Sequence, residues 1–150
     1  MKRILFVCHG NICRSPMAEF IMKHLLKERG LEKEFLVESA AVSWEETGNP
    51  IYPPAKRCLS QHGIWFDPAK SARAVSPADY DRYDLIVCMD ASNLRYLQRI
   101  IPSDPQGKIR LLMSYAGTAR DVADPWYTED FEQAYRDILE GCEGMMKQLV

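Results

Sequence analysis

A cysteine and an arginine six positions apart could form an anion site near the start of the chain. The segment from Cys8 to Arg14 begins with a thiol and ends with a guanidinium, and Ser15-Pro16 then provide a favoured helix start. Inward-facing backbone amides, the helix N-terminus and Arg14 would together bind a phosphate. We expect the Cys8 sulfur at the floor of this site to be a thiolate, which is a nucleophile for phosphoryl transfer.

The loop and a later segment supply the other groups that this chemistry needs. Gly10 and Asn11 are residue types that tolerate a positive φ, as a tight ring of amides requires. Departure of an ester oxygen also needs a proton donor, and the best candidate is Asp124 in Asp124-Pro125-Trp126-Tyr127. Its two aromatic neighbours could form the wall of a slot for a flat ring.

Alternating strands and helices are expected to position these groups. In such α/β proteins the sheet is parallel and covered on both faces, and ligands bind beyond the carboxyl ends of the strands. The segment after the first strand lies at that end. Strands are expected at about 4–7, 35–40, 84–89 and 108–112. Helices are expected at about 15–29, 55–61, 91–100 and 131–149, and residues 76–79 are expected to open another short helix. Ser15 and Asp90 are expected as N-caps, residues 42–54 as loop, and Asp124 on a loop.

Composition restricts the class of protein. The chain has 150 residues, 47% of them hydrophobic and 27% charged, and a net charge of -2. We expect a single domain over residues 1–150, and this charge argues against a general nucleic-acid or polybasic membrane binder. No apolar run approaches the roughly 20 residues of a membrane span, and no export signal is evident. We therefore expect a cytoplasmic protein whose cysteines are thiols, with Cys58, Cys88 and Cys142 in the core and His24 and His62 structural or exposed.

The extended motif C-x-G-N-I-C-R-S-P-M-A-E at residues 8–19 closely resembles the low-molecular-weight protein tyrosine phosphatases. The position of this motif near the N-terminus, the late Asp-Pro-Trp-Tyr segment and the length of the chain fit the same family. The resemblance covers essentially the whole chain. It implies a flavodoxin-like three-layer sandwich around a four-stranded parallel sheet of order 2-1-3-4. It also implies metal-free hydrolysis of phosphotyrosine in proteins, without a cofactor.

The resemblance also implies roles for individual residues. Cys8 would form a cysteinyl-phosphate, Arg14 would clamp the phosphoryl group, and Asp124 would act as general acid and then general base. Ser15 would hydrogen-bond the sulfur, and Asn11 would hold the loop in shape. Cys13 would be a redox partner of Cys8. The implied phosphate-binding and loop-support set is His9, Gly10, Asn11, Ile12, Cys13 and Ser15, and the implied substrate pocket is Trp44, Trp126 and Tyr127, with no metal ligands.

Three positions depart from the family pattern. Ala41 and Val42 stand where relatives often have Gly and Thr after the second strand. Lys70 stands where many relatives have a His that braces the loop Asn. The sequence therefore leaves open what supports Asn11 and this strand end.

Other functions on this fold, or with this loop, stay open. Arsenate reductase would need further cysteines near the end of the third strand, where only Cys88 occurs. Phosphoarginine phosphatases tend to place Thr at the position of Ile12, and a non-catalytic phosphate-binding module would lack Cys8 or Asp124. The expected partners are phosphotyrosine proteins, and neither a cognate tyrosine kinase nor the oligomeric state is decided by the sequence.

Overall fold

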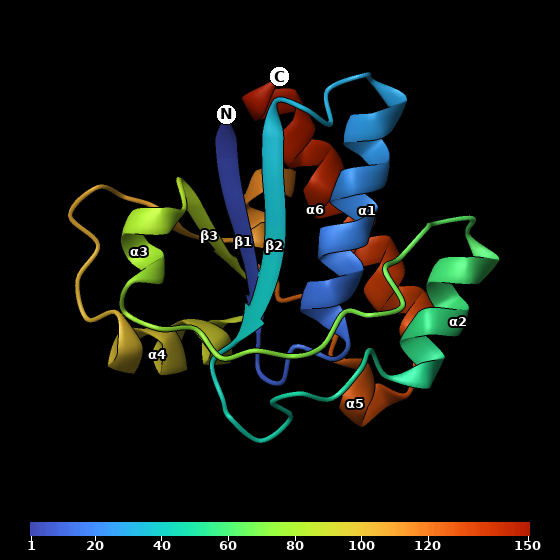
Figure 1. Ribbon diagram of the computed structural model, residues 1–150, viewed down its shortest axis with the longest axis horizontal. Helices are drawn as coiled ribbons and strands as arrows, with labels where there is room; N and C mark the ends of the chain where they lie inside the picture. Colours follow the sequence, from blue (N-terminus) through green and yellow to red (C-terminus); the bar gives the residue numbers. More distant parts are fainter.

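Four parallel strands form the central layer in the computed structural model, which describes residues 1–150 (Figure 1). Their order is β2-β1-β3-β4, so the predicted sheet topology is confirmed. The first strand pairs with both β2 and β3, which places its carboxyl end in the middle of the sheet edge. The strands are β1 (Lys2–Cys8), β2 (Phe35–Ala41), β3 (Leu85–Cys88) and β4 (Ile109–Leu111).

Helices cover both faces of this sheet, because the central strand buries both of its side-chain rows. Ile4 and Phe6 of β1 pack on one face with α1 (Arg14–Glu28) and α6 (Phe131–Leu149). Leu5 and Val7 pack on the other face, with residues of α4 (Ala91–Ile100). Successive strand residues point to opposite faces, so an unbroken apolar run is what such a strand requires. Figure 1 shows α1 and α6 on one side of the sheet and α3 and α4 on the other. The predicted three-layer arrangement is confirmed.

The smaller elements complete the layers and include two that the sequence did not predict. The 3-10 helix η1 (Leu112–Ala116) begins at the residue expected to end the fourth strand, and α5 (Pro125–Thr128) replaces the loop expected around Asp124. The remaining helices are α2 (Pro53–Gln61) and α3 (Asp79–Arg82). None of the helices combines the length and the apolar character needed to cross a bilayer.

Helix α6 approaches η1 so closely that two of its residues must be glycine. A Cβ on Gly144 would lie 2.2 Å from the Tyr115 carbonyl oxygen, and one on Gly141 would lie 2.5 Å from Leu112 Cγ. The Tyr115 oxygen is a backbone atom and cannot rotate away. Because α6 closes the face of the sheet that holds the larger core, this contact bears on the stability of the fold.

We expect Gly144→Ala to lower the free energy of unfolding by about 2 kcal/mol. An overpacked contact costs about 1–3 kcal/mol, and the better helix propensity of Ala returns at most about 1 kcal/mol. Urea unfolding at constant m-value measures the difference. Glu143→Ala, at the exposed neighbouring position, is the control and should change stability little. Equal stability of both variants would mean that η1 moves freely against α6.

Candidate active site

The segment between β1 and α1 forms a pocket at the carboxyl end of the central strand. Most of the site residues predicted from the sequence line this pocket. Two acidic residues that the sequence did not predict, Glu45 and Glu46, line it as well. Asp124, Trp126 and Tyr127 reach this pocket from a segment more than 100 positions later in the sequence. The lining residues are Cys8, His9, Gly10, Ile12, Cys13, Arg14, Glu45, Glu46, Asp124, Trp126 and Tyr127.

The Cys8 sulfur lies at the base of the pocket and has two close polar neighbours. Its Sγ is 3.0 Å from the Ser15 hydroxyl oxygen, and the Asn11 backbone N–H donates to it over 3.3 Å. The sulfur also lies near the N-terminal end of α1, which begins at Arg14. The structure thus places the sulfur beside a hydroxyl group, a backbone N–H and the start of a helix.

Ser15 does not cap the helix, and this prediction was wrong. Helix α1 begins at Arg14 with Cys13 as N-cap, and no side chain makes a capping hydrogen bond there. The Ser15 hydroxyl is fully buried and lies instead against Cys8 Sγ and the Asn11 amide. The first backbone amides of α1 therefore have no side-chain cap and are free to bind an anion. Because Ser15 does not cap these amides, its hydroxyl can interact with the Cys8 sulfur.

Asn11 supports the loop from below. It has a φ of 60°, as predicted, and its side-chain amide donates to Ser15 Oγ at 2.8 Å and to Ser39 Oγ at 3.0 Å. The backbone N–H of Arg73 donates to Asn11 Oδ1 over 3.3 Å. Every polar atom of the side chain thus has a partner, and the left-handed backbone of this residue is fixed on three sides.

Gly10 lies close to a neighbouring loop and does not have a positive φ. Its φ is not among the positive values, contrary to the expectation, and a Cβ there would lie 3.2 Å from Glu46 Cγ. The glycine lets the loop containing Glu46 approach the rim of the pocket. Of the two residues expected to have a positive φ, only Asn11 has one.

The Arg14 guanidinium is fixed by acceptors on two other segments. One of its nitrogens donates to the Val122 carbonyl at 3.0 Å, and the other lies 2.9 Å from Asp90 Oδ2 and 3.4 Å from Asp124 Oδ2. The side chain is only 3% exposed. Burial lowers the pKa of Arg14, but attraction to Cys8, Asp124 and Asp90 outweighs burial and raises the pKa above its usual value. The group is a permanent cation with a fixed orientation.

Asp90 contacts Arg14, and the sequence did not predict this contact. Asp90 was predicted as the N-cap of α4, and it does accept from the Asn93 backbone N–H at 2.7 Å in a capping box. Its second oxygen holds Arg14. A signal was present, because Asp90 follows β3 and β3 lies beside β1, so both strands end at the same edge of the sheet.

Asp124 faces the pocket from the start of α5. Its Oδ1 accepts from the Trp126 backbone N–H at 3.1 Å, so it is the N-cap of that short helix, while Oδ2 points to Arg14. The Trp126 ring packs at 5.4 Å from the ring of Tyr52. Tyr127 is 83% exposed at the mouth. A carboxyl group and two aromatic side chains thus stand on the side of the pocket where a flat substrate would enter.

Comparison with known proteins decides the family. The family model described as low molecular weight phosphotyrosine protein phosphatase matches residues 3–150. The chain belongs to this family. It is 38% identical to the low molecular weight protein-tyrosine-phosphatase YfkJ of Bacillus subtilis, over 99% of this chain and 96% of that protein. It is 37% identical to the human low molecular weight phosphotyrosine protein phosphatase, over 98% of this chain and 95% of that protein.

Solved structures of phosphatases agree with this assignment. The crystal structure of YfkJ superposes with a TM-score of 0.93 at 39% identity, covering 99% of this chain and 94% of that one. The structure of DARP, a Drosophila arginine phosphatase, superposes with a TM-score of 0.88 at 36% identity, covering 99% and 98%. The fold and the enzyme class of this phosphatase are therefore established by its relatives.

One predicted pocket residue of the phosphatase lies elsewhere. Trp44 is 75% exposed and does not line the pocket. Its neighbours Glu45 and Glu46 occupy the rim instead, because the chain bends away after β2 and turns the tryptophan outward. His9 is at the same rim, with Nε2 3.5 Å from Glu45 and its ring packed edge-on against Tyr96.

Lys70 takes part in the support beneath the phosphatase loop. Its Nζ lies 3.0 Å from Glu19 Oε1 and donates to the Ser39 carbonyl at 3.2 Å. Ser39 donates to the same Glu19 oxygen at 2.6 Å and also accepts from Asn11. The lysine is therefore linked to Asn11 through Ser39, and the strand end is held by hydrogen bonds of Ala41 and Val42 to Arg73 and Cys8 backbone atoms.

The other thiols are buried, as expected for core cysteines. Cys58, Cys88 and Cys142 are each at most 4% exposed. Cys13 lines the pocket beside Cys8, and both are free thiols. Burial, followed by the charges of Cys8 and Asp124, raises the pKa of Cys13 to about 12, so it is a neutral thiol at physiological pH. A reversible disulfide between Cys8 and Cys13 stays a prediction.

Proposed function

We propose that residues 1–150 act as one catalytic domain that hydrolyses phosphotyrosine in proteins with Cys8, Arg14 and Asp124. The observation that carries the assignment is the convergence of all three on one pocket, with Asp124 Oδ2 3.4 Å from Arg14. A nucleophile, a fixed cation and a proton donor are what transfer of a phosphoryl group to sulfur requires.

The first step transfers the phosphoryl group to the enzyme. Cys8 Sγ attacks phosphorus, the S–P bond forms and the ester P–O bond breaks. Arg14 and the loop amides hold the equatorial oxygens, and removing one such donor typically costs about 10²–10³ in rate. Asp124 gives its proton to the departing tyrosyl oxygen. The exposed rings of Trp126 and Tyr127 flank the entering aromatic group.

The second step releases inorganic phosphate. Water gives a proton to Asp124 and attacks phosphorus, the S–P bond breaks, and the sulfur leaves as a thiolate. The Ser15 hydroxyl, 3.0 Å from the sulfur, donates to it as it departs. The thiolate has the same neighbours before and after the cycle, so no residue of the loop has to move to restore the resting state.

The test is hydrolysis of a phosphotyrosyl peptide by the full chain in EDTA, with rapid denaturation to trap the intermediate. We expect turnover without added metal, inhibition by vanadate, and one labelled phosphoryl group on the peptide that contains Cys8. Turnover that requires a metal, or a phosphoryl group on another residue, would contradict the proposed mechanism.

Hydrolysis of phosphoarginine is the second candidate, because the DARP structure is that of an arginine phosphatase. The pocket of the present chain has Ile12 and two aromatic residues in its lining, which favours an aromatic ester. Comparing kcat/KM for phosphotyrosyl and phosphoarginyl peptides of one sequence separates the two. A higher value for phosphoarginine would reverse the assignment.

A cytoplasmic location and phosphotyrosine proteins as partners belong to the same proposal. The nucleophile must remain a reduced thiol, and reducing compartments maintain thiols. Arsenate reduction has less support, because Cys88 is fully buried within the core and the other thiols outside the loop, Cys58 and Cys142, are buried as well.

We expect Asp90→Asn to lower kcat/KM by about 10- to 100-fold, because small misplacements of a group that positions substrate cost this much. Asn is as good an N-cap as Asp, so α4 should remain stable while the ion pair to Arg14 is lost. Asp130→Asn, at the N-cap of α6, is the matched control. A rate close to that of the control would show that Val122 and the loop suffice to orient Arg14.

A further inference from the structure

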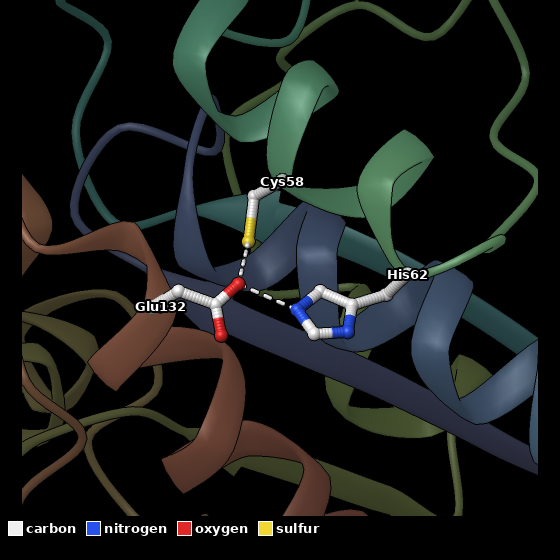
Figure 2. A group of neighbouring side chains, drawn as sticks. All are labelled: Cys58, His62 and Glu132. Atoms are coloured by element: carbon white, nitrogen blue, oxygen red, sulfur yellow. Dashed lines mark hydrogen bonds and ion pairs between the residues drawn. The ribbon is translucent and has the colours of Figure 1, made fainter.

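Three side chains that can bind metals meet outside the phosphatase pocket. Cys58 lies on α2, His62 is the C-cap residue that follows this helix, and Glu132 lies in the first turn of α6. Figure 2 shows all three pointing toward one another, with the Glu132 carboxylate between the sulfur and the imidazole. The catalytic proposal uses none of them. Their sequence spacing gave no sign of a site, because Glu132 is 74 positions from Cys58.

The donor atoms are almost as close as ligands of one zinc ion. Glu132 Oε1 is 3.7 Å from Cys58 Sγ and 2.5 Å from His62 Nε2, and all three atoms lie within 4.8 Å of one another. Tetrahedral zinc, with bonds of about 2.3 Å to sulfur and 2.0–2.1 Å to nitrogen or oxygen, separates its ligands by about 3.4–3.6 Å. For both atoms to bind one ion, Glu132 Oε1 and His62 Nε2 must therefore move apart by about 1 Å.

The donor set selects among metals. A thiolate, an imidazole and a carboxylate suit Zn²⁺, whereas Mg²⁺ and Ca²⁺ prefer oxygen ligands alone. The sulfur is at the buried floor of the cluster, and the side chains of His62 and Glu132 are 31% and 45% exposed. This opening gives a metal ion a path to the sulfur and leaves the fourth position to water.

The cluster is partly organised before any ion binds. The His62 ring stacks on the Tyr135 ring with centroids 3.7 Å apart and an interplanar angle of 9°. This contact fixes the plane in which His62 Nε2 points toward Glu132. Zinc binds a thiolate, so formation of a Zn–S bond releases the Cys58 proton to solvent.

We propose that Cys58, His62 and Glu132 form a Zn²⁺ site that joins α2 to α6. The ion would link α2, which follows Tyr52, to α6, which begins at Phe131. The rings of Tyr52 and Phe131 already stack with centroids 6.2 Å apart, and the Tyr52 ring also packs against Trp126. Zinc binding thus stabilises the packing behind the aromatic wall of the pocket. It takes no part in the reaction, which proceeds in EDTA under the proposal above.

The test is titration of the full chain with Zn²⁺ by calorimetry and with Co²⁺ by absorbance. Both use a Cys8→Ser, Cys13→Ser background, because the pocket thiols would otherwise offer a competing site. We expect one ion per chain and a near-ultraviolet thiolate-to-Co²⁺ band. Zn²⁺ should also raise the urea midpoint, since it binds only the folded chain.

Single substitutions in that background identify the ligands. Cys58→Ser should remove the Co²⁺ band, and His62→Ala should weaken Zn²⁺ binding by at least about 100-fold, since even partners outside the ligand set contribute 10–100-fold. His24→Ala is the matched control, because His24 is a half-exposed histidine paired with Glu28 on α1. Equal Zn²⁺ affinity in the ligand variants, or no stoichiometric binding by the parent, would overturn the proposal and leave a hydrogen-bonded cluster only. Neither outcome depends on whether the chain hydrolyses phosphotyrosine.

Discussion

Replacement of Cys8 by serine should abolish turnover of every phosphate ester, by at least about 10⁴-fold in kcat, as expected when the covalent nucleophile is lost. A serine hydroxyl at this position keeps the shape of the loop but has no negative charge to attack with. Arg14 and the amides stay in place, because Arg14 is fixed by Val122 and Asp90 rather than by the sulfur. The variant should therefore still bind vanadate and phosphotyrosyl peptides.

The matched control is Cys58→Ser, which makes the same chemical change at a buried thiol outside the pocket. In EDTA its kcat should equal that of the parent. Steady-state hydrolysis measures kcat, and calorimetry with a non-hydrolysable phosphonate measures binding. If Cys8→Ser retained more than about one hundredth of the activity, direct attack by water on the ester would replace the covalent mechanism.

The fold could be read from the sequence because its signals are local. Apolar runs such as Ile4 to Val7 mark strands buried on both faces, and the C-terminal helix shows its period over five turns. The order of the strands in the sheet, in contrast, was predicted only from the resemblance to a family. The sequence did not predict the short elements η1 and α5, because four or five residues are too few to show a periodic pattern.

The pocket was predictable where residues are neighbours in sequence and less so where the fold joins distant segments. Cys8 and Arg14 share one loop, so their chemistry was evident. The second role of Asp90 depends on β3 lying beside β1, and the partners of Lys70 depend on contacts among α1, β2 and its own loop. Serine is a favoured N-cap residue, so Ser15 was predicted to cap the helix. In the structure its hydroxyl is buried against Cys8 instead.

Asp124→Asn should lower kcat/KM by about 10²–10⁴ for phosphotyrosyl peptides, the usual contribution of a general acid. Asparagine has no proton to give to the departing oxygen, yet it can still accept from the Trp126 backbone N–H and cap α5. The ratio kcat/KM reports substrate binding and cleavage of the ester bond but not hydrolysis of the intermediate, since release of the leaving group precedes that hydrolysis. The loss should therefore depend on the leaving group.

Dinitrophenyl phosphate provides the decisive comparison, because its leaving oxygen departs as an anion without a proton. We expect the Asp124→Asn defect to shrink to less than about 10-fold with this substrate, whereas a defect in binding or folding would lower kcat/KM for both substrates alike. This comparison is necessary because Asp124 Oδ2 contacts Arg14, so a substitution of Asp124 could also strengthen ground-state binding of the phosphate. Tighter binding lowers KM and kcat together and leaves kcat/KM unchanged. An equal loss on both esters would assign Asp124 to positioning Arg14 and would leave the proton donor to another group of the pocket.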